Sequence, residues 1–206
     1  MTYCFPGFTD MPFPLTYQLC REARFWRCFD QKSTTMETLS AEYLFRAEAW
    51  LLITTLIYFI MNGAGIFETA VIIPKWTAAP PESLQIFKGE YGIDLKIFWI
   101  AMHSIHEITF IVAIAFCWNI PGIREAMLIL FVVHFGVRVW TLTYFAPNII
   151  EFQKVANGEA VIPNLAERAK RWRNLNYVRT GLFVAVSIGV LAVFVGVLQM
   201  AIVQNL

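Results

Sequence analysis

Charged residues are scarce in this chain. They make up 15% of its 206 residues, whereas a soluble domain of this size carries about a quarter. Hydrophobic residues reach 58%, so the chain cannot surround an apolar core with a charged surface, and a large soluble enzyme is excluded. The formal net charge is only +1, with basic residues scattered among acidic ones. We therefore expect no nucleic-acid partner.

Recognisable cysteine and targeting motifs are also missing. The cysteines form no CxxC pair and no zinc-binding spacing, so they indicate neither a metal ribbon nor a disulfide scaffold. Residues 1–48 contain no apolar core followed by a small-residue cleavage site, so they do not form a recognisable signal peptide. We expect a poorly structured tail there, with a helix-prone segment from Glu37 to Glu48. Met36, just ahead of that segment, is an alternative start of the chain. The four cysteines are Cys4, Cys20, Cys28 and Cys117.

Long apolar runs are what the sequence does contain. Crossing a bilayer takes about 20 residues, and four runs are long enough. They lie at about 50–73, 96–118, 124–146 and 177–203. The sequence therefore predicts an all-α integral membrane protein, in which residues 49–206 form a four-helix bundle with antiparallel neighbouring spans. An even number of spans also places both termini on the same side of the membrane.

Prolines and turns set the predicted ends of the spans. We expect the first span to end at Pro74 and the third to stop before Pro147, because proline has no N–H to donate within a helix. The tight turn at Pro121-Gly122 makes the second and third spans antiparallel neighbours. The fourth span is expected to open at Asn176, after a separate basic helix-prone segment from Leu165 to Arg173.

The positions of Lys and Arg predict the orientation in the membrane. More of these residues gather at the end that carries the two long loops than at the end that carries the termini. Because positive residues concentrate on the cytoplasmic side, we expect the loop-rich end to be cytoplasmic and the termini to lie on the non-cytoplasmic side.

Six ionisable residues fall inside the predicted spans. A charged side chain in hydrocarbon costs about 2.5–3.5 kcal/mol on insertion scales, so each is expected to face the bundle interior and to be paired. Counting about 1.5 Å per residue from the turn at Pro121 places His106 and His134 within roughly 3 Å of the same depth. By helical period, the members on the second span share one face, as do those on the third. The six are Glu68, His103, His106, Glu107, His134 and Arg138.

Several chemistries are open to this cluster. Its imidazoles and carboxylates are ligand types for iron, copper or zinc, which makes the three histidines, Glu107 and Glu68 a candidate metal site. A b-type haem held between His106 and His134 is an alternative. A third interpretation is a packing network in which Glu68 pairs with Arg138 and the histidines satisfy one another or bridge waters. Without a metal, we expect proton handling, and the catalytic residues would then be His106, His134, Glu107 and Arg138.

The first and last spans carry further candidates. Asn62 is central in the first span, and Trp172, Asn176 and Arg179 lie at the start of the fourth. We expect these four to contact a substrate, although Trp and Arg at such a position also serve as headgroup anchors. Small residues recur along the fourth span and predict close helix contact and a homo-oligomer interface. This small-residue seam consists of Gly181, Ala185, Gly189, Ala192 and Gly196.

Two segments carry a resemblance to a known family. Trp172 precedes the last span and is followed by Asn176 and, three residues on, by Arg179. The first span reads Asn62-Gly63-Ala64-Gly65-Ile66-Phe67-Glu68 and leads to Pro74-Lys75-Trp76. In these segments, and in the spacing of spans over about residues 50–200, the chain resembles the anthrone oxygenases, a group of small four-span membrane proteins. The resemblance implies oxygenation of a polycyclic phenolic substrate without a tightly bound cofactor. The His103-x-x-His106-Glu107 motif with His134 departs from that pattern and favours a diverged activity.

Three functional hypotheses follow from the sequence. The leading one is a membrane oxidoreductase or oxygenase that acts on a lipophilic small molecule entering between the helices, with iron, copper, haem or no cofactor. The second is a small oligomeric transporter or proton pathway, for which intramembrane His and Glu residues are the expected material. The third is a non-catalytic subunit of a larger membrane complex.

Overall fold

The structure is a computed structural model that describes residues 40–204, and over that range it contains helices and no strands. Four continuous helical stretches are long and apolar enough to cross a membrane, so this is a multi-pass membrane protein. The predicted all-α four-span fold is confirmed. Residues 1–39 of the predicted tail lie outside the described residues. The four stretches are Ala41–Trp76, Lys96–Phe116, Ile123–Ala156 and Leu165–Val203.

The first stretch is longer than predicted at both ends. Helix α2 (Ala41–Phe67) begins inside the helix-prone segment of the predicted tail, and the π-helical turn η1 (Glu68–Ile72) links it to α3 (Ile73–Trp76). The prediction that the span ends at Pro74 is wrong. In η1, the N–H of Ile73 bonds to the carbonyl of Glu68, five residues back, and this wider turn lets Pro74 occupy the first turn of α3.

The third stretch repeats the same arrangement. Helix α5 (Ile123–Trp140) continues through a second π-helical turn, η3 (Thr141–Phe145), into α6 (Ala146–Ala156). The N–H of Ala146 bonds to the carbonyl of Thr141, and Pro147 lies in the first turn of α6. The predicted stop before Pro147 is therefore also wrong, and for the same physical reason: the missing N–H falls where a new helical segment begins.

The last stretch is a single helix. The predicted basic segment and the predicted fourth span merge into α7 (Leu165–Gln204), whose 40 residues extend over about 60 Å. Helix α7 is thus longer than a bilayer core is thick, and its first turns lie beyond the hydrocarbon at the loop-rich end. An ion pair from Arg168 to Glu151 of α6, at 2.6 Å, ties this end of α7 to the neighbouring helix.

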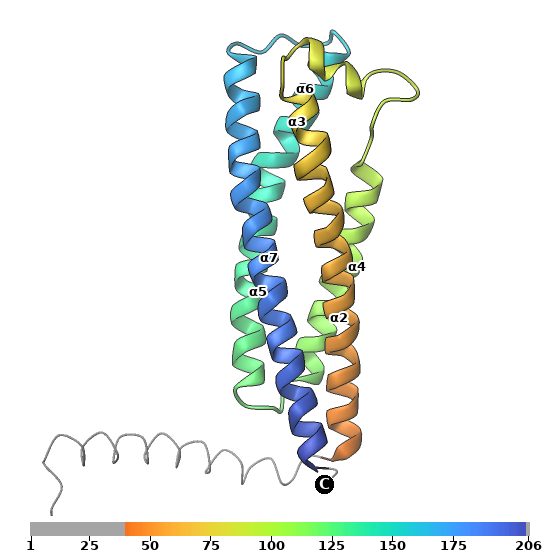
Figure 1. Ribbon diagram of the computed structural model, residues 1–206, viewed down its shortest axis with the longest axis vertical. Coiled ribbons are helices and arrows are strands. Elements are labelled where there is room, and N and C mark those ends of the chain that lie inside the picture. The colour runs from red at the N-terminus through yellow and green to blue at the C-terminus, as the bar shows by residue number, and fades with distance from the viewer. Residues whose placement is uncertain (1–39, 205–206) are drawn as a thin grey trace, which may run out of the picture. The chain divides into compact units, whose positions relative to one another are not determined.

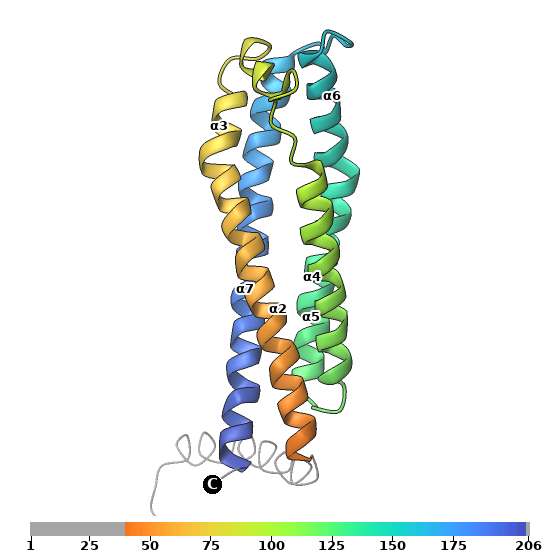
Figure 2. The same cartoon turned by 90° about the vertical axis from the view of Figure 1, so that its right-hand side faces the viewer.

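The helices pack side by side with alternating direction (Figures 1 and 2). Helix α2 packs mainly against α7 and against α4 (Lys96–Phe116), and α5 packs mainly against α7. Helices α4 and α5 are antiparallel, as the turn at Pro121-Gly122 predicts, yet they share far less contact with each other than α2 shares with α4. The bundle is therefore least closely packed between α4 and α5.

A separate aromatic core closes the loop-rich end. The 3-10 helix η2 (Glu82–Phe87) folds over α3, α6 and the start of α7, and Trp76 and Trp172 meet there with ring centroids 5.0 Å apart. None of the six ionisable residues predicted within the spans belongs to this core. It is built from Ile73, Trp76, Leu84, Phe145, Phe152, Ala156, Ala169 and Trp172.

Candidate functional site

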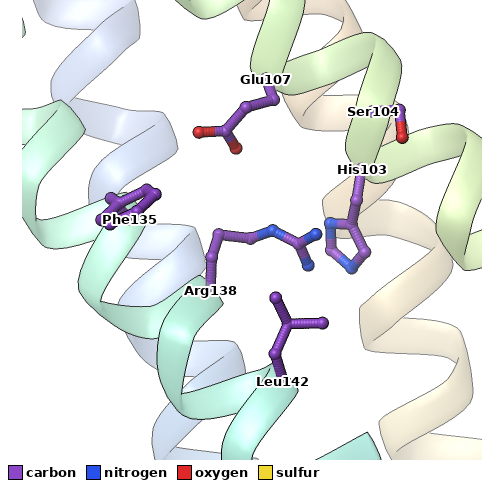
Figure 3. Close-up of a pocket in the computed structure, with 6 residues that line it drawn as sticks. All are labelled: His103, Ser104, Glu107, Phe135, Arg138 and Leu142. Carbon is purple, nitrogen blue, oxygen red and sulfur yellow. The ribbon is translucent and has the colours of Figure 1, made fainter.

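A pocket of about 240 Å³ opens between α4 and α5, where the two helices are loosely packed. Three polar or charged side chains face it from within the bundle: His103, Glu107 and Arg138. Ser104, Phe135 and Leu142 border it and are exposed on the outer surface of the helices, which faces lipid in a membrane. The pocket therefore opens sideways toward the bilayer. Figure 3 shows the Arg138 guanidinium extending toward the His103 ring, with the Glu107 carboxylate on the other side of the opening.

Behind the pocket, hydrogen bonds join three helices. The Nε2 atom of His134 lies 3.1 Å from Oε2 of Glu107, and its Nδ1 atom lies 3.0 Å from the hydroxyl of Tyr58. His134 and Tyr58 are fully buried, while about a quarter of the Glu107 side chain remains exposed on the pocket side. Glu107 therefore connects the pocket to a buried pair that water does not reach.

Two acidic side chains each interact electrostatically with a different arginine, and the two interactions lie in different parts of the bundle. Arg138 interacts electrostatically with Glu107 across the pocket. Glu68 instead experiences the charge of Arg179 of α7, although these two side chains do not form a direct ion pair. The predicted pairing of Glu68 with Arg138 is therefore not formed. The reason is the π-helical turn: it begins at Glu68 and lies against α7 rather than against α5.

The other two histidines are packed without hydrogen bonds to the described residues. His106 is fully buried, and both its ring nitrogens lack a partner there; its ring contacts Tyr58, at 4.1 Å between centroids. His103 stacks on Trp99 at 5.2 Å, and its Nδ1 atom also lacks a partner. The predicted hydrogen bonds between the histidines themselves are therefore not formed among the described residues. The predicted equal depth of His106 and His134 is confirmed, since their rings lie 4.8 Å apart.

The same geometry tests the metal and haem interpretations. Within residues 40–204, no group of three or more His, Cys, Asp or Glu side chains is arranged to hold one metal ion. His134 uses both nitrogens in hydrogen bonds, and Glu68 lies with Arg179, so the predicted metal ligand set is not assembled. The rings of His106 and His134 are in contact, which leaves no space for a porphyrin between them. Neither group fits the residues as they are placed.

Two predicted substrate-binding residues are instead structural contacts. Asn62 is buried and donates a hydrogen bond to the Ser187 hydroxyl at 2.8 Å, linking α2 to α7. Trp172 is buried in the aromatic core and donates from its indole N–H to the carbonyl of Phe145 at 3.2 Å. Neither lines the pocket. A polar residue in a span can thus be explained by helix cross-linking alone.

The two remaining predicted residues connect the π-helical turns. Asn176, fully buried, donates to the Thr69 hydroxyl of η1 at 3.0 Å and accepts from the Arg179 guanidinium at 2.6 Å. Arg179 in turn lies 3.5 Å from the Thr141 hydroxyl and over the ring of Phe145 at 4.4 Å, both in η3. Asn176 and Arg179, which were expected to contact a substrate, therefore form a cluster inside the bundle that links α7 to both π-helical turns.

Part of the small-residue seam of α7 packs against α5, and the rest is exposed on the surface of the bundle. Gly189 lies so close to Leu130 of α5 that a Cβ atom would come within 2.5 Å of it, and Gly196 faces Ile123 of the same helix. Gly181 has no atom within 4 Å of the position that a Cβ would take, and Ala185 and Ala192 are exposed. Part of the seam thus serves packing within one chain, and the homo-oligomer stays a prediction for the exposed part.

Sequence reasoning missed Tyr58, Thr69 and Thr141, which all contact the candidate residues. Tyr58 had a detectable signal, because a tyrosine in the middle of a span needs a hydrogen-bond partner at that depth. Threonines are common in membrane helices and commonly bond their own backbone, so Thr69 and Thr141 could not be singled out.

Comparisons with known protein families, with curated proteins and with solved structures find no match for this chain, so the geometry of the site carries the functional argument.

Proposed function

We propose that this protein is a membrane oxidoreductase that takes a lipophilic carbon acid from the bilayer into the pocket between α4 and α5 and oxygenates it. The observation that carries the proposal is the placement of Glu107 and Arg138 in a pocket that opens toward lipid. An acid–base residue and a cation facing one ligand-sized space are what proton removal from an apolar molecule requires.

Glu107 is suited to act as the base. Its Oε2 atom is engaged by His134, which leaves Oε1 for a ligand in the pocket. Arg138 is placed to stabilise the negative charge that develops on the substrate oxygen when a neighbouring carbon loses its proton.

The carbanion then reacts with dioxygen, which is the oxidant. For a methylene group, the balance is that one methylene and one dioxygen molecule give one carbonyl group and one water molecule. The carbon is oxidised, one oxygen atom stays on it as the carbonyl oxygen, and the other leaves as water with the two methylene hydrogens. Glu107 takes up the first of these protons and returns it to the departing oxygen.

The resemblance to the anthrone oxygenases supports this reaction class. Trp172, Asn176 and Arg179, which carry the resemblance, hold the loop-rich half of the bundle together in this structure. Their role here is to shape the scaffold beside the pocket. Glu107, held by His134, then supplies the acid–base chemistry.

Oxygen uptake by the detergent-purified protein with anthrone as the probe tests the proposal. We expect stoichiometric formation of the quinone, with one oxygen atom derived from labelled dioxygen. Glu107→Gln retains an acceptor for His134 but removes the base, so the turnover rate should fall by about 100-fold or more. Glu90→Gln, in the exposed loop before α4, is the matched control and should leave the rate unchanged.

Three results would contradict the proposal. Full turnover by Glu107→Gln would remove Glu107 from the chemistry. No oxygen uptake, combined with proton flux when the protein is reconstituted in proteoliposomes, would favour the proton pathway instead. Stable co-purification of a partner with neither activity would favour a non-catalytic subunit.

A further inference from the structure

Tyr58 is a buried polar side chain that makes a hydrogen bond to His134 and to which no role has been given. Its hydroxyl lies 3.0 Å from Nδ1 of His134, and among residues 40–204 it makes no other hydrogen bond. We infer that Tyr58 is a positioning residue that donates to Nδ1 of His134 and so holds the ring in the orientation in which its Nε2–H meets Glu107. This inference rests on the proposed function for its catalytic meaning, but the geometry behind it is independent of any reaction.

The direction of the hydrogen bonds follows from the donors and acceptors present. A carboxylate only accepts, so His134 must carry its proton on Nε2 to bond Oε2 of Glu107. Its Nδ1 atom is then a bare acceptor, and the hydroxyl of Tyr58 is the donor that meets it. The three groups form one chain, from Tyr58 O–H to Nδ1 and from Nε2–H to Glu107. In the other tautomer, the Nε2 lone pair would face the carboxylate and repel it.

Among residues 40–204, the hydroxyl of Tyr58 is the donor that meets Nδ1 of His134. His134 is fully buried, and its phenylalanine neighbours Phe110, Phe131 and Phe183 carry no hydrogen-bond donor. The ring of His106 also touches that of His134, but neither of its nitrogens makes a hydrogen bond to the described residues. An imidazole nitrogen left bare in such a place loses the hydrogen bond that water would give it.

The ring of Tyr58 is itself held in place. It packs on His106 at 4.1 Å between centroids and meets the ring of His134 edge-on at 5.5 Å with an interplanar angle of 88°. Helix α2 thus delivers the hydroxyl to a fixed point between α4 and α5. His106, whose nitrogens have no partner among the described residues, serves as the surface on which that ring rests.

Imidazole 15N NMR reads the tautomer directly. The chain has three histidines, so uniform 15N-histidine labelling in nanodiscs gives a small set of signals, and a His134→Gln variant assigns those of His134. In the wild type, we expect a protonated Nε2 and an unprotonated Nδ1, with well-separated shifts. Tyr58→Phe keeps the ring that packs on His106 but removes the donor, so the signal of the unprotonated Nδ1 should move downfield while Nε2 stays protonated opposite Glu107. Tyr177→Phe, on the lipid-exposed face of α7, should change nothing.

The NMR signals of the wild type and of Tyr58→Phe each support or overturn the positioning role of Tyr58. A wild-type His134 protonated on Nδ1 would overturn it without any variant, so the test does not depend on whether Tyr58→Phe folds. Unchanged His134 shifts in a folded Tyr58→Phe protein would also overturn it. In the oxygen-uptake assay, we expect kcat of Tyr58→Phe to fall by about tenfold or more while KM is retained. If the NMR result holds but Glu107→Gln is fully active, the positioning role of Tyr58 stands and the proposed function fails.

Discussion

Replacing Asn176 with alanine separates two roles that this residue can have. The sequence predicts that it binds substrate, whereas the structure shows it fully buried between Thr69 and Arg179. If it is a structural cross-link, Asn176→Ala should destabilise the bundle. If it binds substrate, the variant should remain stable but lose activity.

The magnitude follows from the two hydrogen bonds. The bond to the Thr69 hydroxyl is neutral and contributes about 0.6–1.5 kcal/mol, the lower figure being typical of bonds between membrane helices. The bond from the Arg179 guanidinium, at 2.6 Å, is charge-assisted and contributes about 1.5–3 kcal/mol. We therefore expect Asn176→Ala to lower the free energy of unfolding by about 2–4.5 kcal/mol.

Reversible unfolding in mixed micelles with increasing SDS, followed by circular dichroism, measures this loss. Asn174→Ala is the matched control, because Asn174 lies on the same helix and makes none of these hydrogen bonds. A double-mutant cycle with Thr69→Val should recover the Thr69 contribution as a coupling energy of about 0.5–1.5 kcal/mol. An Asn176→Ala protein that unfolds like the wild type but no longer turns over substrate would refute the structural reasoning.

Two further predictions concern helix packing and metal dependence. Gly189→Val should destabilise the bundle by about 1–3 kcal/mol in SDS unfolding, because its side chain would collide with Leu130, whereas Gly181→Val meets no atom within 4 Å and should not. A loss of oligomer in Gly181→Val, measured by light scattering, would establish the exposed part of the seam as a subunit contact, and an unchanged mass would remove it. Dialysis against strong chelators should leave oxygen uptake unchanged, because the nitrogens of His134 are committed to Tyr58 and Glu107. If activity is lost on dialysis and restored by iron or copper, the hydrogen bonds of His134 do not describe the active protein, and a metal site would be supported instead.

Part of the site was accessible from the sequence because helix geometry is regular. The turn at Pro121-Gly122 fixes a reference point, and a constant rise per residue then places His106 and His134 at one depth. Their rings lie in contact in the structure. The same regularity places Glu107 beside His134, and their hydrogen bond is the feature on which the proposed function rests.

The predicted ends of the first and third spans were wrong at the two places where π-helical turns interrupt the regular helix. Pro74 and Pro147 are ordinarily stop signals, and nothing local distinguishes a proline that ends a helix from one that follows a π-helical turn. Only the tertiary contacts do so here: Asn176 and Arg179 of α7 supply partners to Thr69 and Thr141 in the two turns. A sequence window around either proline contains none of these partners.

By itself, the sequence determined that the chain is helical, that it crosses the membrane four times and that ionisable residues cluster at mid-depth, because hydrophobic run length and helical rise are local properties. The tertiary structure alone decided which of these residues meet. It brings Glu68 under the influence of the Arg179 charge and makes His134 hydrogen-bond to Glu107 and Tyr58. It also leaves a pocket between α4 and α5. The rotation of each helix about its axis selects among possible partners, and that rotation is set by packing against all the other helices.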